Sequence, residues 1–162
     1  MVRDHEYFMT SALDEAAKAR DKGNVAVGAV IVQKGEILAR GHNEVDSSFD
    51  ITADAETGTI RKMILSMRQL NPDSKTGAGP FGDCTLYTTV EPCPMCAWVI
   101  CLSGIPTIVL GARHAQLGVP IGEYTIEKFL EMTGRKIKLI TGVLAEECAA
   151  MRRSGRFTPG PR

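Results

Sequence analysis

Apolar residues recur along the chain with two different periods, and the changes between them predict alternating helices and strands. Met9, Leu13 and Ala16 follow the spacing of a helix, and Gly23 stands where that helix would end. Further helices are predicted from Asp54 to Leu70 and over residues 93–103, 125–132 and 143–153. Strands are predicted over residues 25–32, 36–41, 84–90, 107–111 and 136–141.

The order of these elements predicts the fold class. From the N-terminus it is α-β-β-α-β-α-β-α-β-α, an early hairpin followed by strands that alternate with helices. Alternating units place parallel strands side by side in a sheet that helices cover on both faces. We therefore expect an α/β protein of three layers, α/β/α, around a central mixed five-stranded sheet. Residues 1–153 are predicted to form one domain and 154–162 a C-terminal tail, with loops at 43–52 and 71–83.

Composition narrows the class of protein further. The 162 residues include 19 basic and 19 acidic ones, and this zero net charge argues against a protein that grips a long nucleic-acid backbone. No apolar run approaches the roughly 18 residues of a membrane span, and the first residues do not resemble a signal peptide. Five cysteines, an odd number, do not fit a secreted disulfide framework, so a cytoplasmic location is expected.

The most specific local motif is a pair of cysteines, Cys93 and Cys96, that follows a predicted strand and opens a helix. Residues three apart on a helix project on the same side, so both sulfurs can reach one ion. The helix dipole also favours thiolates in the first turn. Metal binding, a thioredoxin-like redox pair and two inert buried cysteines all fit this spacing. The redox pair usually follows the first strand of its domain, whereas these cysteines lie past the midpoint of the chain.

A second short segment bears on this choice. Asp54 and Glu56 also stand at a predicted helix start, and taken alone they are typical of an N-cap and an acidic first-turn residue. Together with Pro92, Cys93 and Cys96 they are similar to the zinc-deaminase signature, in which H-x-E is followed downstream by P-C-x-x-C.

Several blocks of sequence, in the same order, resemble the cytidine-deaminase-like superfamily, and within it the branch of tRNA adenosine deaminases, guanine deaminases and fungal-type cytosine deaminase. The blocks are HEYFMTSALDEAAKARDKG, VAVGAVIV, ARGHN, TADAETGTIRK, TLYTTVEPCPMC, GIPTIVLGAR and TGVLAEECAAM. They cover nearly the whole chain, and the resemblance implies the three-layer α/β/α fold that the element order already predicts.

The resemblance also implies a Zn²⁺ cofactor and a set of site residues. Cys93 and Cys96 would bind zinc, and Asn43 would contact the substrate base. Glu56 would carry a proton from the attacking water to the leaving amine. Asp54 stands where the family has a histidine or cysteine as third ligand. Carboxylate oxygen also binds zinc, but with two thiolates it makes a site with three negative charges, which should acidify the bound water less.

Some residues keep two interpretations at this stage. His42 is an alternative metal donor, and Asn43 can also simply end a strand. Apolar residues that either line a base pocket or belong to the core are Tyr87, Met95 and Trp98. Phe157 lies in the tail, where a frayed end or an aromatic cover of the site are the alternatives. Cys84, Cys101 and Cys148 are expected to be ordinary thiols.

The expected substrate class follows from the net charge of the chain and from one difference between its sequence and that of the tRNA branch. A tRNA deaminase needs basic surface, whereas the one acid-free basic cluster here is the tail with Arg152, Arg153, Arg156 and Arg162. The tRNA branch usually has an acidic residue and Ala-Lys after its fourth strand, where this chain has His114-Ala115-Gln116. We therefore predict a zinc-dependent deaminase of a small amino-substituted heterocycle such as guanine or cytosine.

Two alternative functions and a homodimeric assembly are kept as further hypotheses. The first alternative is a tRNA-specific adenosine deaminase. The second is a catalytically altered, zinc-binding deaminase-like module, because Asp54 replaces the family ligand. The resemblance implies a homodimer, since relatives have active sites near subunit interfaces, and no membrane partner is expected.

Overall fold

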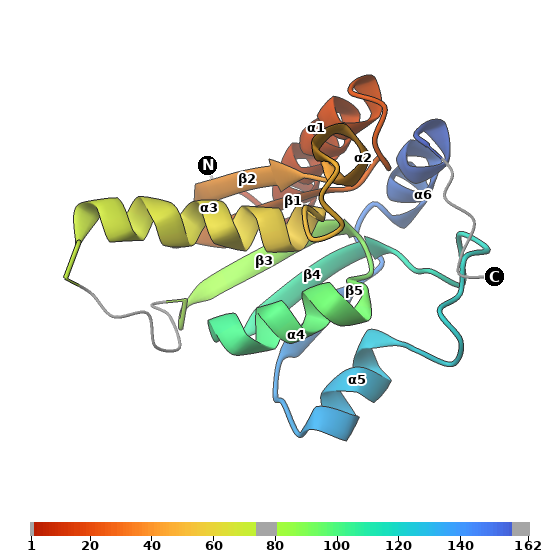
Figure 1. Ribbon diagram of the computed structural model, residues 1–162. Helices are drawn as coiled ribbons and strands as arrows, with labels where there is room; N and C mark the ends of the chain where they lie inside the picture. Colours follow the sequence, from red (N-terminus) through yellow and green to blue (C-terminus); the bar gives the residue numbers. More distant parts are fainter. Residues whose placement is uncertain (1, 74–80, 157–162) are drawn as a thin grey trace.

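Five strands form one mixed sheet in the computed structural model, which describes residues 2–73 and 81–156 (Figure 1). The strands are β1 Gly28–Gln33, β2 Glu36–His42, β3 Cys84–Val90, β4 Thr107–Ala112 and β5 Lys138–Thr141. Their order across the sheet is β2-β1-β3-β4-β5. β1 pairs antiparallel with β2 and β3, whereas β3, β4 and β5 are parallel. This arrangement confirms the predicted mixed five-stranded sheet.

Helices cover both faces of the sheet. The helices are α1 His5–Asp21, α2 Val45–Ser48, α3 Ala55–Leu70, α4 Pro94–Ser103, α5 Ile126–Thr133 and α6 Ala145–Ser154. α1 and α6 pack side by side on one face, and α3, α4 and α5 lie on the other (Figure 1). Each face buries its own apolar cluster, one around Ile31 and Leu86, the other around Val30 and Tyr87. The three-layer α/β/α fold is therefore confirmed.

Two local features of the sequence fix the position of α1 against the sheet and the two ends of α4. A Cβ atom on Gly28 would lie 2.1 Å from the carbonyl oxygen of Ala12, so only glycine lets α1 lie this close to β1. Cys93 is the extended N-cap of α4, Pro94 occupies its first turn, and Gly104 ends it in the left-handed region at φ 78°. Cys93 and Cys96 thus both lie at the start of one helix.

The structure differs from the sequence-based elements in a few places. β1 begins at Gly28 rather than at residue 25, and β5 begins at Lys138 rather than at residue 136. The loop predicted over residues 43–52 contains the single-turn helix α2. The side-chain oxygen of Asn24 accepts hydrogen bonds from the backbone N–H groups of Asp46 and Ser47, and this distant contact supports the turn. Part of the loop predicted at 71–83, most of the tail, and Phe157 lie outside the described residues.

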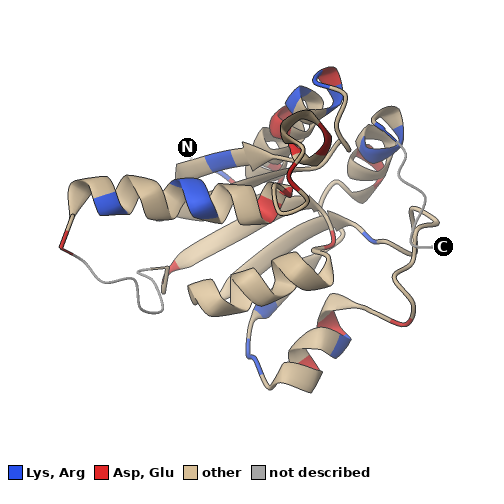
Figure 2. Cartoon of the chain, viewed as in Figure 1, with Lys and Arg blue, Asp and Glu red and all other residues tan. Residues whose placement is uncertain are grey.

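Charged side chains of both signs are scattered over the molecule, with one clear exception (Figure 2). α4 carries no charged residue, whereas the last turn of α6 carries Arg152 and Arg153. Within the described residues, no helix combines the length and the apolar character that a membrane span requires.

Candidate active site

Four strand ends meet at one edge of the sheet, and the candidate residues follow them directly. In the register of the sheet, Gly28 at the start of β1 lies opposite His42 at the end of β2, and Val90 at the end of β3 lies beside Ala112 at the end of β4. Side chains from these strand ends, together with the first turns of α3 and α4, converge on the same edge. The carboxyl ends of parallel strands are a common location for ligand sites.

Asp54, Cys93 and Cys96 come together at this edge. One ligand atom from each lies within 4.8 Å of the others. The Oδ2 atom of Asp54 is 3.5 Å from the Sγ of Cys93 and 3.4 Å from the Sγ of Cys96. The structure thus juxtaposes the three residues that the sequence analysis put forward as metal ligands.

The donor set fits a zinc ion. One carboxylate oxygen and two sulfurs are ligands that zinc accepts, and three protein ligands leave a fourth position for water. Hydrogen bonding with Cys96 lowers the pKa of the Cys93 thiol, while the same pairing, together with burial, raises the pKa of Cys96. Three acidic groups at such short range repel one another once ionised, and a divalent cation would relieve that repulsion.

Glu56 lines the same cavity as these residues and is buried. The hydroxyl of Thr88 donates a hydrogen bond to its Oε1 atom at 2.9 Å. Burial raises the pKa of Glu56 well above its ordinary value, and the negative charges of Asp54 and Cys93 raise it further. A carboxyl group in this environment takes up a proton readily, as a general acid and base requires.

Asn43 directly follows β2, and its side chain forms a hydrogen bond with Asp54, the N-cap of α3. Its side-chain amide donates to the Oδ1 atom of Asp54 at 3.1 Å, and its carbonyl oxygen accepts from the backbone N–H of Val45 at 3.1 Å. The side chain is buried and lines the same cavity as Glu56. Its position is therefore compatible with a substrate contact, but its side-chain hydrogen bonds in this structure are with Asp54 and Val45.

A cavity of about 180 Å³ opens over these residues. Its lining consists of Val25, Val27, Asn43, Asp54, Glu56, Val90, Glu91, Cys93, His114, Val119 and Arg152. Pockets for drug-sized ligands hold roughly 300–1,000 Å³, so this cavity suits a single heterocyclic base better than a whole nucleotide.

Three lining residues carry chemistry that the sequence analysis did not assign to the site. Glu91 is buried and accepts hydrogen bonds from Arg113 and from the backbone N–H of Ile126. Burial lowers the pKa of His114, and its buried Nε2 atom has no hydrogen-bond partner among the described residues. Arg152 contributes a positive charge from α6. For Glu91 the signal in the sequence was an acidic residue between an apolar strand and Pro92-Cys93.

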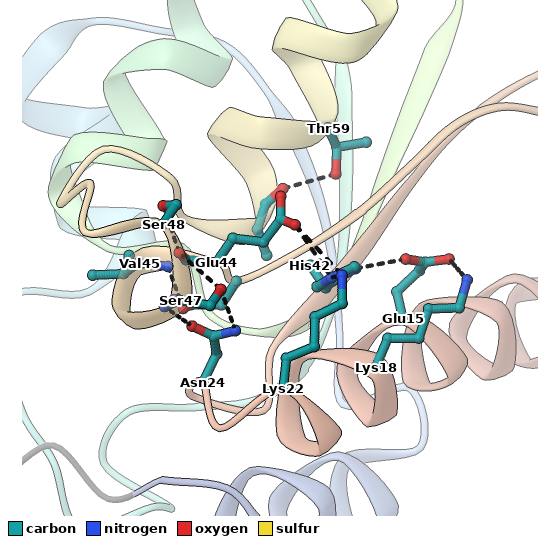
Figure 3. A network of polar contacts seen from close by, with 12 residues as sticks. Glu15, Lys18, Lys22, Asn24, His42, Glu44, Val45, Ser47, Ser48 and Thr59 are labelled. Atoms are coloured by element: carbon teal, nitrogen blue, oxygen red, sulfur yellow. Dashed lines mark hydrogen bonds and ion pairs between the residues drawn. The ribbon is translucent and has the colours of Figure 1, made fainter.

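His42 belongs to a different polar cluster beside the site (Figure 3). Its Nδ1 atom is 2.9 Å from Oε2 of Glu15, and its Nε2 atom is 3.2 Å from the ammonium group of Lys22. Because an ammonium group can only donate, Nε2 accepts and Nδ1 carries the proton that Glu15 receives. Both ring nitrogens thus have partners, and His42 is not one of the converging donors.

The remaining residues that the sequence analysis singled out lie away from the cavity. Tyr87 is buried, and its hydroxyl is 2.9 Å from Nδ1 of His5, so it belongs to the core. Cys84, Cys101 and Cys148 are buried free thiols, and burial raises the pKa of Cys148 to about 12. Their thiols keep their protons near neutral pH.

A buried carboxyl beside converging oxygen and sulfur donors, at the end of a mixed sheet, is the arrangement of a zinc deaminase. Residues 2–112 match the cytidine and deoxycytidylate deaminase zinc-binding region. The chain therefore belongs to this family, whose cofactor is Zn²⁺, and it is a hydrolase that acts on carbon–nitrogen bonds.

Three deaminases of named activity are similar to most of the chain. It is 36% identical over 153 residues to the tRNA-specific adenosine deaminase of Bacillus subtilis (strain 168), covering 93% of this chain and 87% of that one. A solved structure from studies of A-to-I editing by tRNA:A34 deaminases has a TM-score of 0.72 and 30% identity, covering 90% of this chain and 98% of that one. Guanine deaminase from Bacillus subtilis has a TM-score of 0.60 and 34% identity, covering 72% and 69%.

Proposed function

We propose that this chain deaminates adenosine to inosine in tRNA, at the wobble position of the anticodon. The observation that carries the proposal is the similarity to a tRNA-specific adenosine deaminase over 93% of the chain. The likeness to a structure studied for tRNA:A34 editing supports it. A cavity for one base also suits an enzyme that takes a single nucleotide out of a loop.

This proposal replaces our sequence-based preference for a small free base. The net charge of zero is a sum over the whole chain, whereas contact with an RNA backbone depends on where the basic groups lie. Arg152 lines the cavity, and Arg153 and Arg156 follow it on the same segment. The basic cluster that the sequence analysis placed in the tail therefore begins at the site itself.

The reaction consumes water and releases ammonia. Water adds to the ring carbon that bears the amino group, and the bond from that carbon to the amino nitrogen then breaks. Glu56 accepts the proton from the water at a carboxylate oxygen and returns it to the departing nitrogen. Thr88 donates to Oε1 of Glu56 and so holds the carboxyl in place in the cavity lining.

The metal centre in this proposal consists of Asp54, Cys93 and Cys96. Bound zinc supplies a water molecule of lowered pKa and a positive charge near the reacting carbon. The three side chains would hold the ion, while Glu56, which lines the same cavity as Asp54 and Cys93, manages the proton.

An RNA substrate separates this proposal from its alternatives. The full-length protein is incubated with an anticodon stem-loop that carries adenosine at the first anticodon position, and inosine is measured by mass spectrometry of the digested nucleosides. We expect inosine from this RNA and none from free adenosine or from a stem-loop with the adenosine moved within the loop. Deamination of a free base with no inosine in either stem-loop or full tRNA would reject the proposal.

Deamination of free guanine is the second candidate. The cavity of about 180 Å³ accommodates a purine ring, and a guanine deaminase shares 34% identity with the chain. Arg153, which lies outside the cavity lining, distinguishes the two. With an RNA substrate, Arg153→Ala should weaken binding and reduce its salt dependence, whereas release of ammonia from free guanine should not respond.

We also propose that the chain forms a homodimer through α4. Met95, Trp98 and Leu102 lie along one side of this uncharged helix with exposed fractions of 37%, 40% and 53%. Light scattering on the purified protein should show a dimer, and Leu102→Glu should shift it toward the monomer. A wild-type monomer at micromolar concentration would contradict this assembly.

A further inference from the structure

The two oxygens of the Asp54 carboxylate have different surroundings. Oδ1 accepts two N–H groups, from the side chain of Asn43 at 3.1 Å and from the backbone of Ala55 at 2.8 Å. Oδ2 faces the sulfurs of Cys93 and Cys96 at 3.5 and 3.4 Å. One oxygen is therefore held by the protein and the other is turned toward the cysteines.

Asn43 is itself held firmly in the position that this contact requires. Its backbone N–H donates to the carbonyl of Val27, and its side-chain oxygen accepts from the N–H of Val45. The backbone N–H of the neighbouring Glu44 donates to the carbonyl of Ala53, which ties the Asn43 segment to the start of α3. Because the amide oxygen accepts an N–H, the amide nitrogen must be the end that faces Asp54.

A carboxylate ligand needs such a partner more than an imidazole does. An imidazole presents a ring nitrogen in a fixed direction, whereas a carboxylate can rotate and offer either oxygen or both. Hydrogen bonds from neighbouring groups orient a metal ligand, and losing one typically costs about 10- to 100-fold in metal affinity. Two N–H groups on Oδ1 of Asp54 hold the carboxylate so that Oδ2 is the oxygen offered beside the sulfurs.

We propose that Asn43 is a positioning residue for the metal ligand Asp54, and that this chain uses it to orient a carboxylate toward zinc. The inference rests on the proposed ligation by Asp54 and is independent of the substrate. It assigns to Asn43 a role different from the contact with the substrate base that the resemblance to the superfamily implies.

The test is the zinc affinity of the full chain, measured by competition with a chromogenic chelator. We expect Asn43→Ala to bind zinc about 10- to 100-fold more weakly than the wild type. Asn43→Ser keeps a hydroxyl that can support the turn at Val45 but lacks the amide N–H, so it should lose a similar factor. This second variant covers the case in which alanine disturbs folding, which thermal unfolding of each variant will show.

Asn24 provides the matched control. It is fully buried and braces the same short helix α2 through Asp46 and Ser47, but it makes no contact with Asp54 among the hydrogen bonds of the described residues. Asn24→Ala should therefore lower stability while keeping wild-type zinc affinity. An equal loss of zinc affinity in Asn24→Ala and Asn43→Ala would overturn the proposal, because a general disturbance of α2 would then explain both.

A double-mutant cycle with Asp54→His tests whether Asn43 acts on zinc affinity through the Asp54 carboxylate. With histidine at position 54 there is no carboxylate to orient, so Asn43→Ala should then cost much less zinc affinity than in the wild-type background. Unchanged zinc affinity in Asn43→Ala together with a raised KM would reject positioning in favour of substrate contact. Retention of zinc by Asp54→Ala would instead show that the ligand assignment itself is wrong.

Discussion

Two adjacent residues, His42 and Asn43, belong to two polar clusters that differ in whether basic side chains are bonded to their acidic groups. The cluster around His42 contains the carboxylates of Glu15 and Glu44 and the ammonium groups of Lys18 and Lys22, so its acids have bases beside them (Figure 3). The cluster beside Asn43 contains Asp54, Glu56, Cys93 and Cys96. In the described part of the chain, no lysine or arginine hydrogen bond reaches that second group of acids.

The difference indicates which cluster is structural and which awaits a cation. Buried charges are tolerated when they are paired and hydrogen-bonded, and the Glu15 cluster meets that condition with its own residues. The Asp54 cluster has Arg152 in the same cavity lining, but that guanidinium makes no hydrogen bond to these acids among the described residues. Four acidic groups facing a single cation leave an excess of negative charge, which is the property of a metal site. The comparison therefore supports the two roles without reference to any relative, and four substitutions test it.

The largest effect is expected from Asp54→Ala. Removing this carboxylate takes away one proposed ligand, so the purified protein should lose its stoichiometric zinc and its deaminase activity together. Elemental analysis by mass spectrometry measures the zinc. Asp50→Ala is the matched control, because that carboxylate binds Thr52 rather than the cysteines, and it should retain the metal. Full zinc occupancy in Asp54→Ala would contradict the assignment.

Glu56→Gln should separate chemistry from metal binding. The amide cannot accept the proton from water, so the turnover rate should fall by about 10²- to 10⁴-fold while zinc content stays at the wild-type level. Steady-state kinetics and elemental analysis on the same sample provide both readouts. Glu44→Gln, from the other cluster, should leave the rate unchanged. A Glu56→Gln enzyme that works at the wild-type rate would refute the proton-transfer role.

Asp54→His should move the acidic side of the pH–rate profile. This substitution removes one negative charge beside the reacting water, so the water should ionise at lower pH and the acidic limb should shift downward. A unit charge at this range typically changes a pKa by about 1–3 units. The rate is measured across pH with zinc at saturation, and a limb that stays in place or rises would count against the charge argument.

The smallest effect concerns the balanced cluster. Burial acts to raise the pKa of Glu15, but hydrogen bonds from Lys18 and His42 bring it below its ordinary value of 4.5. Its stabilising contribution is therefore present above about pH 4.5 and is lost as the pH falls through the lower pKa of the folded state. Glu15→Gln should reduce the free energy of unfolding at pH 7 by about 1–3 kcal/mol and flatten its decline in acid.

Denaturant unfolding followed by circular dichroism at pH 7 and at acidic pH measures this effect. Glu36 supplies the matched control, because its ion pair with Arg3 is exposed and such pairs contribute about 0–1 kcal/mol. Zinc content should not change in Glu15→Gln. A loss of zinc in that variant would show that the two clusters are not independent.

Much of the fold was predictable because it depends on local sequence. Helical spacing identified α3, and the helix predicted over residues 93–103 matches α4 to within one residue at each end. The single turn of α2 was not predictable, because its support comes from Asn24, which lies on another segment. A contact between distant segments leaves no mark on the local pattern of apolar and polar residues.

The candidate site divides in the same way. Asp54, Glu56, Cys93 and Cys96 occur in short motifs at helix starts, and the structure brings them to one edge of the sheet. His114 and Arg152 reach the cavity from separate segments, so only the folded chain reveals their proximity. The relatives support the tRNA alternative better than the small free base that net charge favoured, because a sum over residues contains no positions.

The lining of the cavity has a consequence for how this enzyme can change. The region that matches the zinc-binding family ends at residue 112, whereas His114, Val119 and Arg152 come from beyond it. The residues proposed for the reaction chemistry thus lie within the earlier stretch, whereas one part of the cavity wall comes from the later stretch. An exchange confined to the later stretch would reshape that part of the wall while every proposed catalytic and metal-binding residue stays in place.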